Sequence, residues 1–362
     1  MPFLRALPAW KIRREWERLR QQAGQWHWYV AGPARKSLYE FRRRSLVNVS
    51  QGDHPRWPDV AIVLIYQPKG VLSSLLTELQ HLSDNGFSPV VVSNLPVSDE
   101  DLAQLKPLCH LIIQRPNFGY DFGGYREGIL TVLDQAVPIR NLVVKNDSVW
   151  FPLVPDCDLL DRARNSSADL YGIYLNEYRR KPQRTHLQSY FYRFGPRLVQ
   201  SAEFRTYWRN LWLTDNKHMV IRQCEMKLTE WFRTRGRTIE ALYTLSDLQA
   251  ALKSLTDEEL YEVLRYHVQV DTRSFVQLQN YIDNPGLPGW RSAVDALIDT
   301  EALGRYLMIA HPLPLIAKLN CPVLKKDRQP MYQLQRAELA RTGILEKMTD
   351  AVRAEILSWD RA

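Results

Sequence analysis

Residues 60–93 read VAIVLIYQPKGVLSSLLTELQHLSDNGFSPVVVS, and this stretch decides the fold class of the chain. Its first seven residues, 60–66, form a short apolar run typical of a buried strand. Leucines then recur at helical spacing over residues 70–83, and the run PVVVS at residues 89–93 predicts a second strand. A strand, a helix and a strand in this order predict a βαβ unit, with which a doubly wound α/β fold begins.

The same alternation continues along the chain. Its pattern predicts a helix over residues 99–108, a strand over 111–114, a helix over 125–134 and the strand NLVVK at 141–145. Further strands are predicted over residues 170–174 and 187–194, and helices over 247–254, 257–266, 291–304 and 334–359. This order predicts a mostly parallel sheet flanked by helices, with a helical C-terminal part. The loops that follow the parallel strands should line one crevice.

A glycine-rich segment, RPNFGYDFGGYREG at residues 115–128, precedes the fourth strand. Glycines such as Gly119 and Gly124 permit positive φ and a close approach of the backbone to a ligand. Asn117 and Asp121 add polar groups between them. We therefore expect a bend that binds a bulky polar ligand, such as a nucleotide sugar.

Asn146, Asp147 and Ser148 follow the predicted strand 141–145 directly. The aspartate offers a hard oxygen ligand for Mg²⁺ or Mn²⁺, and such an ion would bridge a diphosphate leaving group. The alternative is an ordinary turn after a strand, because Asn-Asp-Ser is common turn chemistry.

Four segments, in this order, resemble the rhamnan synthesis protein F family. They are RPNFGYDFGGYREGI (115–129), VVKNDSVWFP (143–152), HLQSYFYRF (186–194) and VIRQCEMKLTEWF (220–232). The resemblance runs from about Val60 to about Lys326 and includes the late segment HPLPLIAKLNCPVLKKD. It implies a GT-A-like glycosyltransferase of bacterial surface polysaccharide assembly. Asn146-Asp147-Ser148 would then occupy the place of the Asp-x-Asp metal motif. Only one of its two usual carboxylates is present, so a weakly held divalent ion and a metal-free site both stay open.

The predicted site combines this resemblance with the residues themselves. Donor-binding groups are expected at Gln67, Asn117, Gly119, Asp121, Gly124, Asn146 and Asp147, with Asp147 as the metal ligand. Gln67 belongs to a Pro-Lys-Gly turn before a helix, whose N-terminal amides favour phosphate; the alternative is a plain connector. Lys325 and Lys326 could also meet a diphosphate, although a solvated lysine pair is the more ordinary explanation.

The resemblance places the acceptor beside His186, Gln188, Ser189 and Tyr190, which supply hydrogen bonds and ring stacking. The alternative is a half-buried strand with a hydrogen-bonded histidine. Glu225 is the predicted catalytic base, because an inverting transfer needs one carboxylate to take the acceptor proton. Its alternative role is a purely electrostatic one at the start of a helix.

Composition limits the remaining possibilities. The 362 residues, 45% of them hydrophobic, suffice for one large or two ordinary globular domains. The four cysteines are scattered without C-x-x-C spacing, which favours neither a zinc site nor a disulfide framework. The chain shows no apolar run long enough to span a bilayer and no secretory signal, so a cytoplasmic location is expected.

The first 50 residues hold eleven Lys or Arg and three Glu, and so carry the chain's whole net charge of +8. Tryptophans at positions 10, 16, 26 and 28 accompany these basic residues. Basic and aromatic residues together are typical of a helix at a lipid surface, which predicts peripheral attachment to the inner face of the plasma membrane. The alternative is a helix packed on the main domain. Nucleic acid is not an expected partner, because the basic excess ends at residue 50.

These observations predict a basic helical arm (residues 1–55), a GT-A-like domain (56–330) and a C-terminal amphipathic helix (331–362). The predicted activity is transfer of a sugar, such as rhamnose or another deoxysugar, from a nucleotide-sugar donor to a lipid-linked oligosaccharide. The alternative is a catalytically silent, membrane-attached carbohydrate-binding scaffold. The sugar, the linkage, the acceptor and the oligomeric state are left open.

Overall fold

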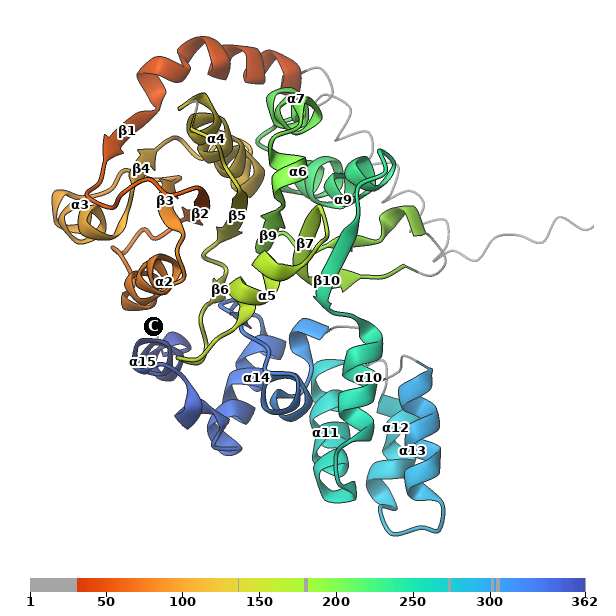
Figure 1. Cartoon of the computed structure of the whole chain (residues 1–362). Helices are drawn as coiled ribbons and strands as arrows, with labels where there is room; N and C mark the ends of the chain where they lie inside the picture. Colours follow the sequence, from red (N-terminus) through yellow and green to blue (C-terminus); the bar gives the residue numbers. More distant parts are fainter. Residues whose placement is uncertain are drawn as a thin grey trace, which may run out of the picture.

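The computed structural model describes residues 31–135, 137–178, 182–272, 275–300, 303 and 307–361. Their strands form one large sheet in the order β1-β4-β3-β2-β5-β9-β7-β10, with β8 paired to β7 (Figure 1). The bounds are β1 Asn48–Gln51, β2 Asp59–Ile65, β3 Ser88–Ser93, β4 Leu111–Gln114, β5 Asn141–Asn146, β7 Leu170–Asn176, β8 His186–Leu187, β9 Phe191–Phe194 and β10 Ile239–Tyr243. A small second sheet pairs β6 (Val149–Trp150) with β11 (Leu324–Lys325).

Helices cover both faces of the large sheet and form the C-terminal part (Figure 1). Their bounds are α2 Ser73–Asp84, α3 Asp99–Leu105, α4 Tyr120–Asp134, α5 Leu159–Asn165, α6 Pro196–Val199, α7 Ala202–Asn210, α8 Lys217–Val220, α9 Met226–Arg233, α10 Leu245–Lys253, α11 Asp257–Val270, α12 Phe275–Asp283, α13 Trp290–Asp299, α14 Pro330–Arg341 and α15 Asp350–Trp359.

The predicted mostly parallel α/β sheet is confirmed. Strands β4, β3, β2 and β5 lie side by side and run parallel. Strand β9 pairs antiparallel with both β5 and β7, and β10 runs parallel to β7. The chain order reverses between β2 and β5, and ligands of open α/β sheets bind beside such a reversal.

Strand β2 shows why the sheet is covered on both sides. Its side chains alternate between two hydrophobic cores: Val63 faces the core that contains Leu79 of α2, and Ile62 faces the core that contains Tyr125 of α4. All seven residues of the strand are buried. A continuous apolar run, rather than a polar and apolar alternation, follows from burial on both faces.

The glycine-rich segment differs from its prediction. Helix α4 begins at Tyr120, five residues before the predicted helix, so Gly124 lies inside the helix rather than in a bend. Two neighbouring residues have the left-handed conformation: Gly119, which precedes the helix, with φ of 79°, and Tyr120 with φ of 49°. A Cβ on Gly124 would overlap the Leu64 side chain of β2. The glycine therefore permits close helix–sheet packing.

The predicted N-terminal arm is described only from residue 31, and its tryptophans lie outside the described residues. Residues 31–46 form a helical segment that packs on α4: Tyr39 is buried, and its hydroxyl donates to Glu127 at 2.9 Å. Strand β1 then pairs antiparallel with β4. The structure thus joins residues 31–51 to the α/β domain, whereas the predicted boundary lay at residue 55.

Two predicted elements are interrupted. The strand expected over residues 187–194 is split into β8 and β9, and both Tyr190 and Tyr192 are buried. The single C-terminal helix expected over 334–359 is two helices, α14 and α15, because Gly343 adopts a left-handed φ of 69° between them. Helix α15 packs against α2 (Figure 1). In the part of the chain that is described, no helix has the length and apolar character to cross a membrane.

Candidate active site

The candidate site lies where β2 and β5 end, at the reversal of strand order. The amide of Tyr66 donates to Oδ2 of Asp147 at 2.8 Å, and the amide of Asp147 donates to the carbonyl of Leu64 at 3.0 Å. These two bonds tie the end of β2 to the turn after β5. Asp147 is half-buried. Its carboxylate is therefore held at the sheet edge where the sequence placed the crevice.

Asp121, in the first turn of α4, meets the same turn. Its Oδ2 accepts a hydrogen bond from Nδ2 of Asn146 at 2.9 Å, while Oδ1 of Asn146 accepts from the hydroxyl of Ser148 at 2.6 Å. Burial, with the nearby negative charge of Asp147, raises the pKa of Asp121 to about 6. Asp147 thus lies close enough to Asp121 to oppose the ionisation of Asp121.

Glu225 comes to this site from the second half of the chain. It ends a π-helical turn, Ile221–Glu225, that joins α8 to α9, so it does not start a helix as expected. Such π turns are frequent at functional sites. Oε1 of Glu225 accepts a hydrogen bond from the amide of Ser189 at 3.1 Å, and the carbonyl of Ser189 accepts from Tyr125 of α4 at 2.7 Å. The charge of Glu225 acts on Asp121, so the two predicted carboxylates belong to one cluster.

Lys325 and Lys326 are half-buried at this cluster rather than solvated. The pairing of β11 with β6 brings them there: the amide of Lys326 donates to the carbonyl of Ser148 at 2.9 Å. Nζ of Lys325 donates to the Ser148 hydroxyl at 2.9 Å, and Nζ of Lys326 donates to the hydroxyl of Ser74 at 3.2 Å. Burial lowers the pKa of both lysines. A lysine pair was visible in the sequence, but its contact with Ser148 was not.

The acceptor residues are brought together only in part. Ser189 and Tyr190 lie at the cluster, since Ser189 contacts Glu225 and Nζ of Lys325 lies 5.3 Å from the centre of the Tyr190 ring. His186 is buried, and its Nδ1 lies 2.6 Å from the carbonyl of Arg184. This contact fits the alternative prediction for His186, a hydrogen-bonded histidine of the strand rather than an acceptor-binding one. Gln188 is half-buried between the two strands.

The remaining donor residues lie apart or serve the fold. Asn117 is exposed and lines a hollow beside the helical segment 31–46. A Cβ on Gly119 would lie 2.9 Å from the Leu213 side chain, which indicates packing. Oε1 of Gln67 accepts from the amide of Leu72.

The expected phosphate site at the start of α2 is also occupied from within the protein. The amide of Val71 donates to Asp101, and the amide of Ser74 donates to Oε1 of Glu355 on α15, at 2.9 and 2.8 Å. Neither amide remains available to a phosphate, and the C-terminal helix supplies one of the two carboxylates. The sequence showed no signal for the contact of Glu355, which spans 281 positions.

Whether a divalent ion fits this site depends on the donor atoms that the cluster offers. Among the residues described, no group of three or more His, Cys, Asp or Glu side chains is placed to hold a metal ion. Asp147 and Asp121 each use one carboxylate oxygen for a hydrogen bond, and two ammonium groups lie beside them. Positive side chains oppose a second cation. This donor set does not make the metal site expected at Asp147.

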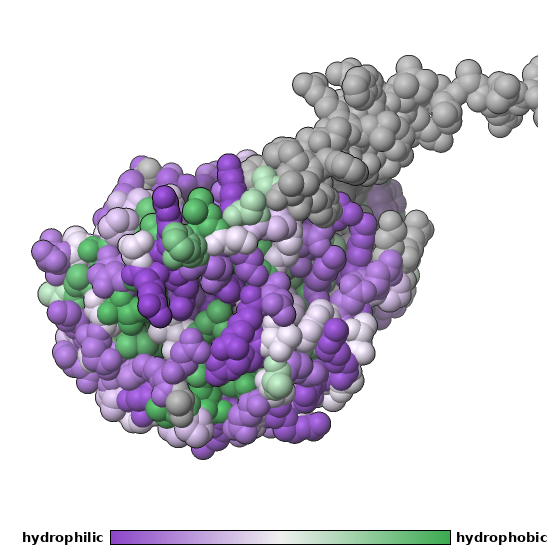
Figure 2. All heavy atoms as spheres, turned by 90° about the horizontal axis from the view of Figure 1, so that it is seen from above, coloured by the Kyte–Doolittle hydropathy of each residue, from purple (hydrophilic) through white to green (hydrophobic). Residues whose placement is uncertain are grey.

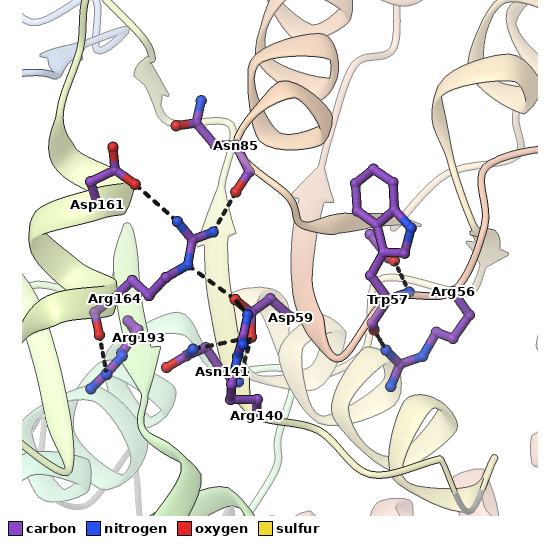
Figure 3. Close-up of polar contacts among 10 residues, drawn as sticks. Arg56, Trp57, Asp59, Asn85, Arg140, Asn141, Asp161, Arg164 and Arg193 are labelled. Carbon is purple, nitrogen blue, oxygen red and sulfur yellow. Dashed lines mark hydrogen bonds and ion pairs between the residues drawn. The ribbon is translucent and has the colours of Figure 1, made fainter.

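A hollow of about 320 Å³ lies at the opposite edge of the sheet, where β2 and β5 begin. Figure 3 shows polar contacts of Arg140, Arg164 and Arg193, which line it. Its arginines serve the fold. Asp59 accepts two hydrogen bonds from Arg140 and one each from Arg164 and the side chain of Asn141, and Arg193 donates to carbonyls around the end of α5. Burial alone would raise the pKa of Asp59, but these hydrogen bonds bring it below its ordinary value.

The surface above the sheet, seen in Figure 2, mixes apolar and charged groups. The helical segment 31–46 contributes three exposed apolar side chains, of which Phe41 is 86% exposed, Leu38 53% and Leu46 39%. Arg35 and Arg42 are exposed on the same segment.

Comparison with known proteins gives one family match and two informative relatives. Residues 89–268 match the family described as rhamnan synthesis protein F. The uncharacterized protein y4gN of Sinorhizobium fredii (strain NBRC 101917 / NGR234) is 38% identical over 354 residues, covering 97% of this chain and 92% of that protein. The virulence protein VirA of Vibrio anguillarum (strain ATCC 68554 / 775) is 28% identical over 176 residues, covering 47% of this chain and 54% of VirA.

Among solved structures, the mannosyltransferase PcManGT from Pyrobaculum calidifontis in complex with GDP-Man and Mn²⁺ aligns with 91% of this chain and 95% of its own. The identity is 12% and the TM-score is 0.33. A TM-score of that size is too low to bear on the fold or the activity of this chain.

Proposed function

Because the chain belongs to the rhamnan synthesis protein F family, we propose that it is a glycosyltransferase of bacterial surface polysaccharide synthesis. The donor is a nucleotide sugar, such as one of rhamnose or another deoxysugar, and the acceptor is a lipid-linked oligosaccharide. One observation carries the proposal. Asp121, Asp147 and Glu225 come from distant parts of the chain and meet at the reversal of strand order, where open α/β sheets bind ligands.

Glu225 is the base of this reaction. Its carboxylate takes the proton of an acceptor hydroxyl while that oxygen forms a bond to the anomeric carbon of the donor. The bond between the anomeric carbon and the diphosphate breaks, and the nucleoside diphosphate leaves with the electron pair. A single displacement with one base inverts the anomeric centre. The amide of Ser189 fixes one oxygen of Glu225, so the other oxygen is available for the proton.

The two aspartates act on the donor. The amide of Tyr66 occupies Oδ2 of Asp147, and the other carboxylate oxygen accepts hydrogen bonds from hydroxyl groups of the sugar donor. Asn146 orients Asp121 beside it. Ser189 lies on the side of Glu225 and contacts the acceptor sugar, whereas the ring of Tyr190 is buried and does not stack on it. We propose a GT-A type enzyme on this basis.

The acceptor is reached at a membrane surface. The exposed Phe41 and Leu38, with Arg42 on the same segment, combine apolar side chains with positive charge. Such a helix face lies in the headgroup region of anionic lipid. We place the protein on the inner face of the plasma membrane for this reason.

The decisive experiment incubates the purified full chain with a panel of nucleotide sugars and a membrane extract that supplies lipid-linked acceptors. Release of nucleoside diphosphate and labelling of the lipid fraction are measured. Glu225→Gln should lower the rate by about 10²-fold or more, because the proton acceptor is lost. Glu230→Gln on the same helical run is the matched control and should retain the wild-type rate. The proposal fails if no nucleotide sugar is bound or consumed, or if both variants behave alike.

A further inference from the structure

Lys325 and Lys326 are two half-buried cations that form no ion pair with the carboxylates of the described residues. In the described part of the chain, neither ammonium forms an ion pair, and each donates to a neutral serine hydroxyl instead. A cation withdrawn from water is costly unless an opposite charge balances it. Further cations add repulsion to this cost, from Lys217 at Lys325 and from Lys145 at Lys326.

A third lysine in the same region shows how the protein treats a structural cation. Lys145 of β5 is fully buried, and its Nζ lies 2.7 Å from Oε1 of the equally buried Glu78. That ion pair is complete within the fold. Lys325 and Lys326 lack an equivalent contact: among the described residues, carboxylates such as Asp121 and Asp147 act on them from beyond ion-pair distance.

The backbone that carries the two lysines is held in place by the C-terminal helices. Arg336 of α14 donates to the carbonyls of Lys325 and Asp327, at 3.2 and 2.9 Å. The indole of Trp359 on α15 donates to the carbonyl of Lys326 at 2.8 Å. Helices α14 and α15 therefore fix the lysine strand against the turn after β5, which is a preorganised rather than an adaptable arrangement.

We infer that Lys325 and Lys326 bind the diphosphate of the donor and supply the positive charge that a divalent ion provides in metal-dependent sugar transfer. The inference rests on the proposed function and names how its donor is held. The diphosphate balances both ammonium groups, and its charge grows as the bond to the sugar breaks. Fixed cations then stabilise the departing nucleoside diphosphate. The two aspartates beside the lysines contact hydroxyl groups rather than a metal.

The test measures binding of inorganic pyrophosphate and of UDP, GDP and dTDP to the full chain by titration calorimetry, in EDTA and in Mg²⁺. Wild-type protein should bind pyrophosphate and at least one nucleoside diphosphate in EDTA, with Mg²⁺ changing the Kd less than threefold. Lys325→Gln and Lys326→Gln should each weaken binding about tenfold, the loss of one charge-assisted hydrogen bond. Lys318→Gln removes an exposed lysine and should bind like wild type.

Folding of the variants is checked in parallel. Removal of a half-buried cation that forms no ion pair should leave the Tm unchanged or raise it, whereas a lysine with a structural role would lower it. Lys326→Arg keeps the charge and should retain binding within about threefold of wild type.

Two results would overturn the inference: ligand binding that requires Mg²⁺, or lysine variants with wild-type affinity. The proposed function is tested separately. Lysine-dependent pyrophosphate binding without any sugar transfer would support the lysine site and contradict the transferase. Sugar transfer at the wild-type rate in the double Lys→Gln variant would support the transferase and contradict the lysine site.

Discussion

The amide of Tyr66 donates a hydrogen bond of 2.8 Å to Oδ2 of Asp147, and this bond joins the ends of two neighbouring parallel strands at the candidate site. One oxygen of Asp147 thus serves the fold, and the other is left for the donor.

Substitutions at Asp147 separate these two roles. Asp147→Asn keeps an oxygen for the Tyr66 amide, so its stability should equal that of wild type. Its kcat/KM for the donor should fall at least about tenfold, because an ionised acceptor is lost. Asp147→Ala should lose this activity and also about 1 kcal/mol of unfolding free energy. Urea unfolding and donor kinetics measure both effects. Wild-type kcat/KM in Asp147→Asn would contradict the role in donor binding.

The raised pKa of Asp121 predicts a pH-dependent stability. Its pKa is about 6 in the folded protein and 3.8 in its ordinary state, so the folded state binds more protons between these values. The stability contribution of this group is therefore present below about pH 4 and is lost as the pH rises to about 6. Asp121→Asn cannot ionise and should be more stable than wild type at pH 7, by about 3 kcal/mol.

The measurement compares wild type and Asp121→Asn by urea unfolding at pH 4 and at pH 7. The difference in unfolding free energy between the two proteins should be small at pH 4 and larger at pH 7. Asp156→Asn, at an exposed position, should show no such trend. A constant difference at both pH values would show that Asp121 does not titrate between them.

The buried pair of Lys145 and Glu78 should be sensitive to loss of one partner. Lys145→Met leaves the carboxylate of Glu78 buried without a cation, and should reduce the unfolding free energy by about 3–5 kcal/mol at pH 7. The double variant Lys145→Met, Glu78→Leu should recover much of this loss, because no charge remains buried. A double variant as unstable as the single one would show that packing, and not the unbalanced charge, causes the loss.

Gly124→Ala tests the packing of α4 on β2. Alanine in an exposed helix interior would add about 1 kcal/mol of stability. At Gly124 the new Cβ overlaps Leu64, so the net effect should be destabilisation by about 1–3 kcal/mol. Gly286→Ala, where the space is open, serves as the control in thermal unfolding. A stabilised Gly124→Ala variant would mean that α4 does not pack so closely.

Attachment to lipid should depend on the exposed face of the helical segment 31–46. Phe41→Ser removes an apolar side chain that is 86% exposed, and should weaken binding to vesicles of anionic phospholipid about tenfold. Arg42→Gln should weaken it less, and its effect should vanish at high salt. Phe275→Ser removes an exposed aromatic elsewhere and is the control in vesicle sedimentation. Equal binding of the Phe41 and Phe275 variants would place the lipid contact elsewhere.

Much of the fold could be predicted because its signals are local. The run at residues 60–66 appears as β2, Asp59–Ile65, and NLVVK appears as the start of β5. Burial on both faces requires apolar residues at every position of such strands, which makes them visible without any knowledge of their neighbours.

The glycine-rich segment could not be read in the same way. Glycine permits both an open bend and close helix packing, and the sequence does not distinguish these uses. In the structure the Leu64 side chain lies where a Cβ on Gly124 would be, so this glycine serves close helix packing.

The sequence by itself determined the parallel sheet and the place of Asp147 at the end of β5, because a buried strand and the turn after it are properties of a few consecutive residues. Only the tertiary structure decided that Asp121, Glu225 and Lys325 share one site. Their meeting depends on helix α4, on the π turn before α9 and on the pairing of β11 with β6. Such contacts join positions far apart in the chain, and no local pattern of residue types specifies them.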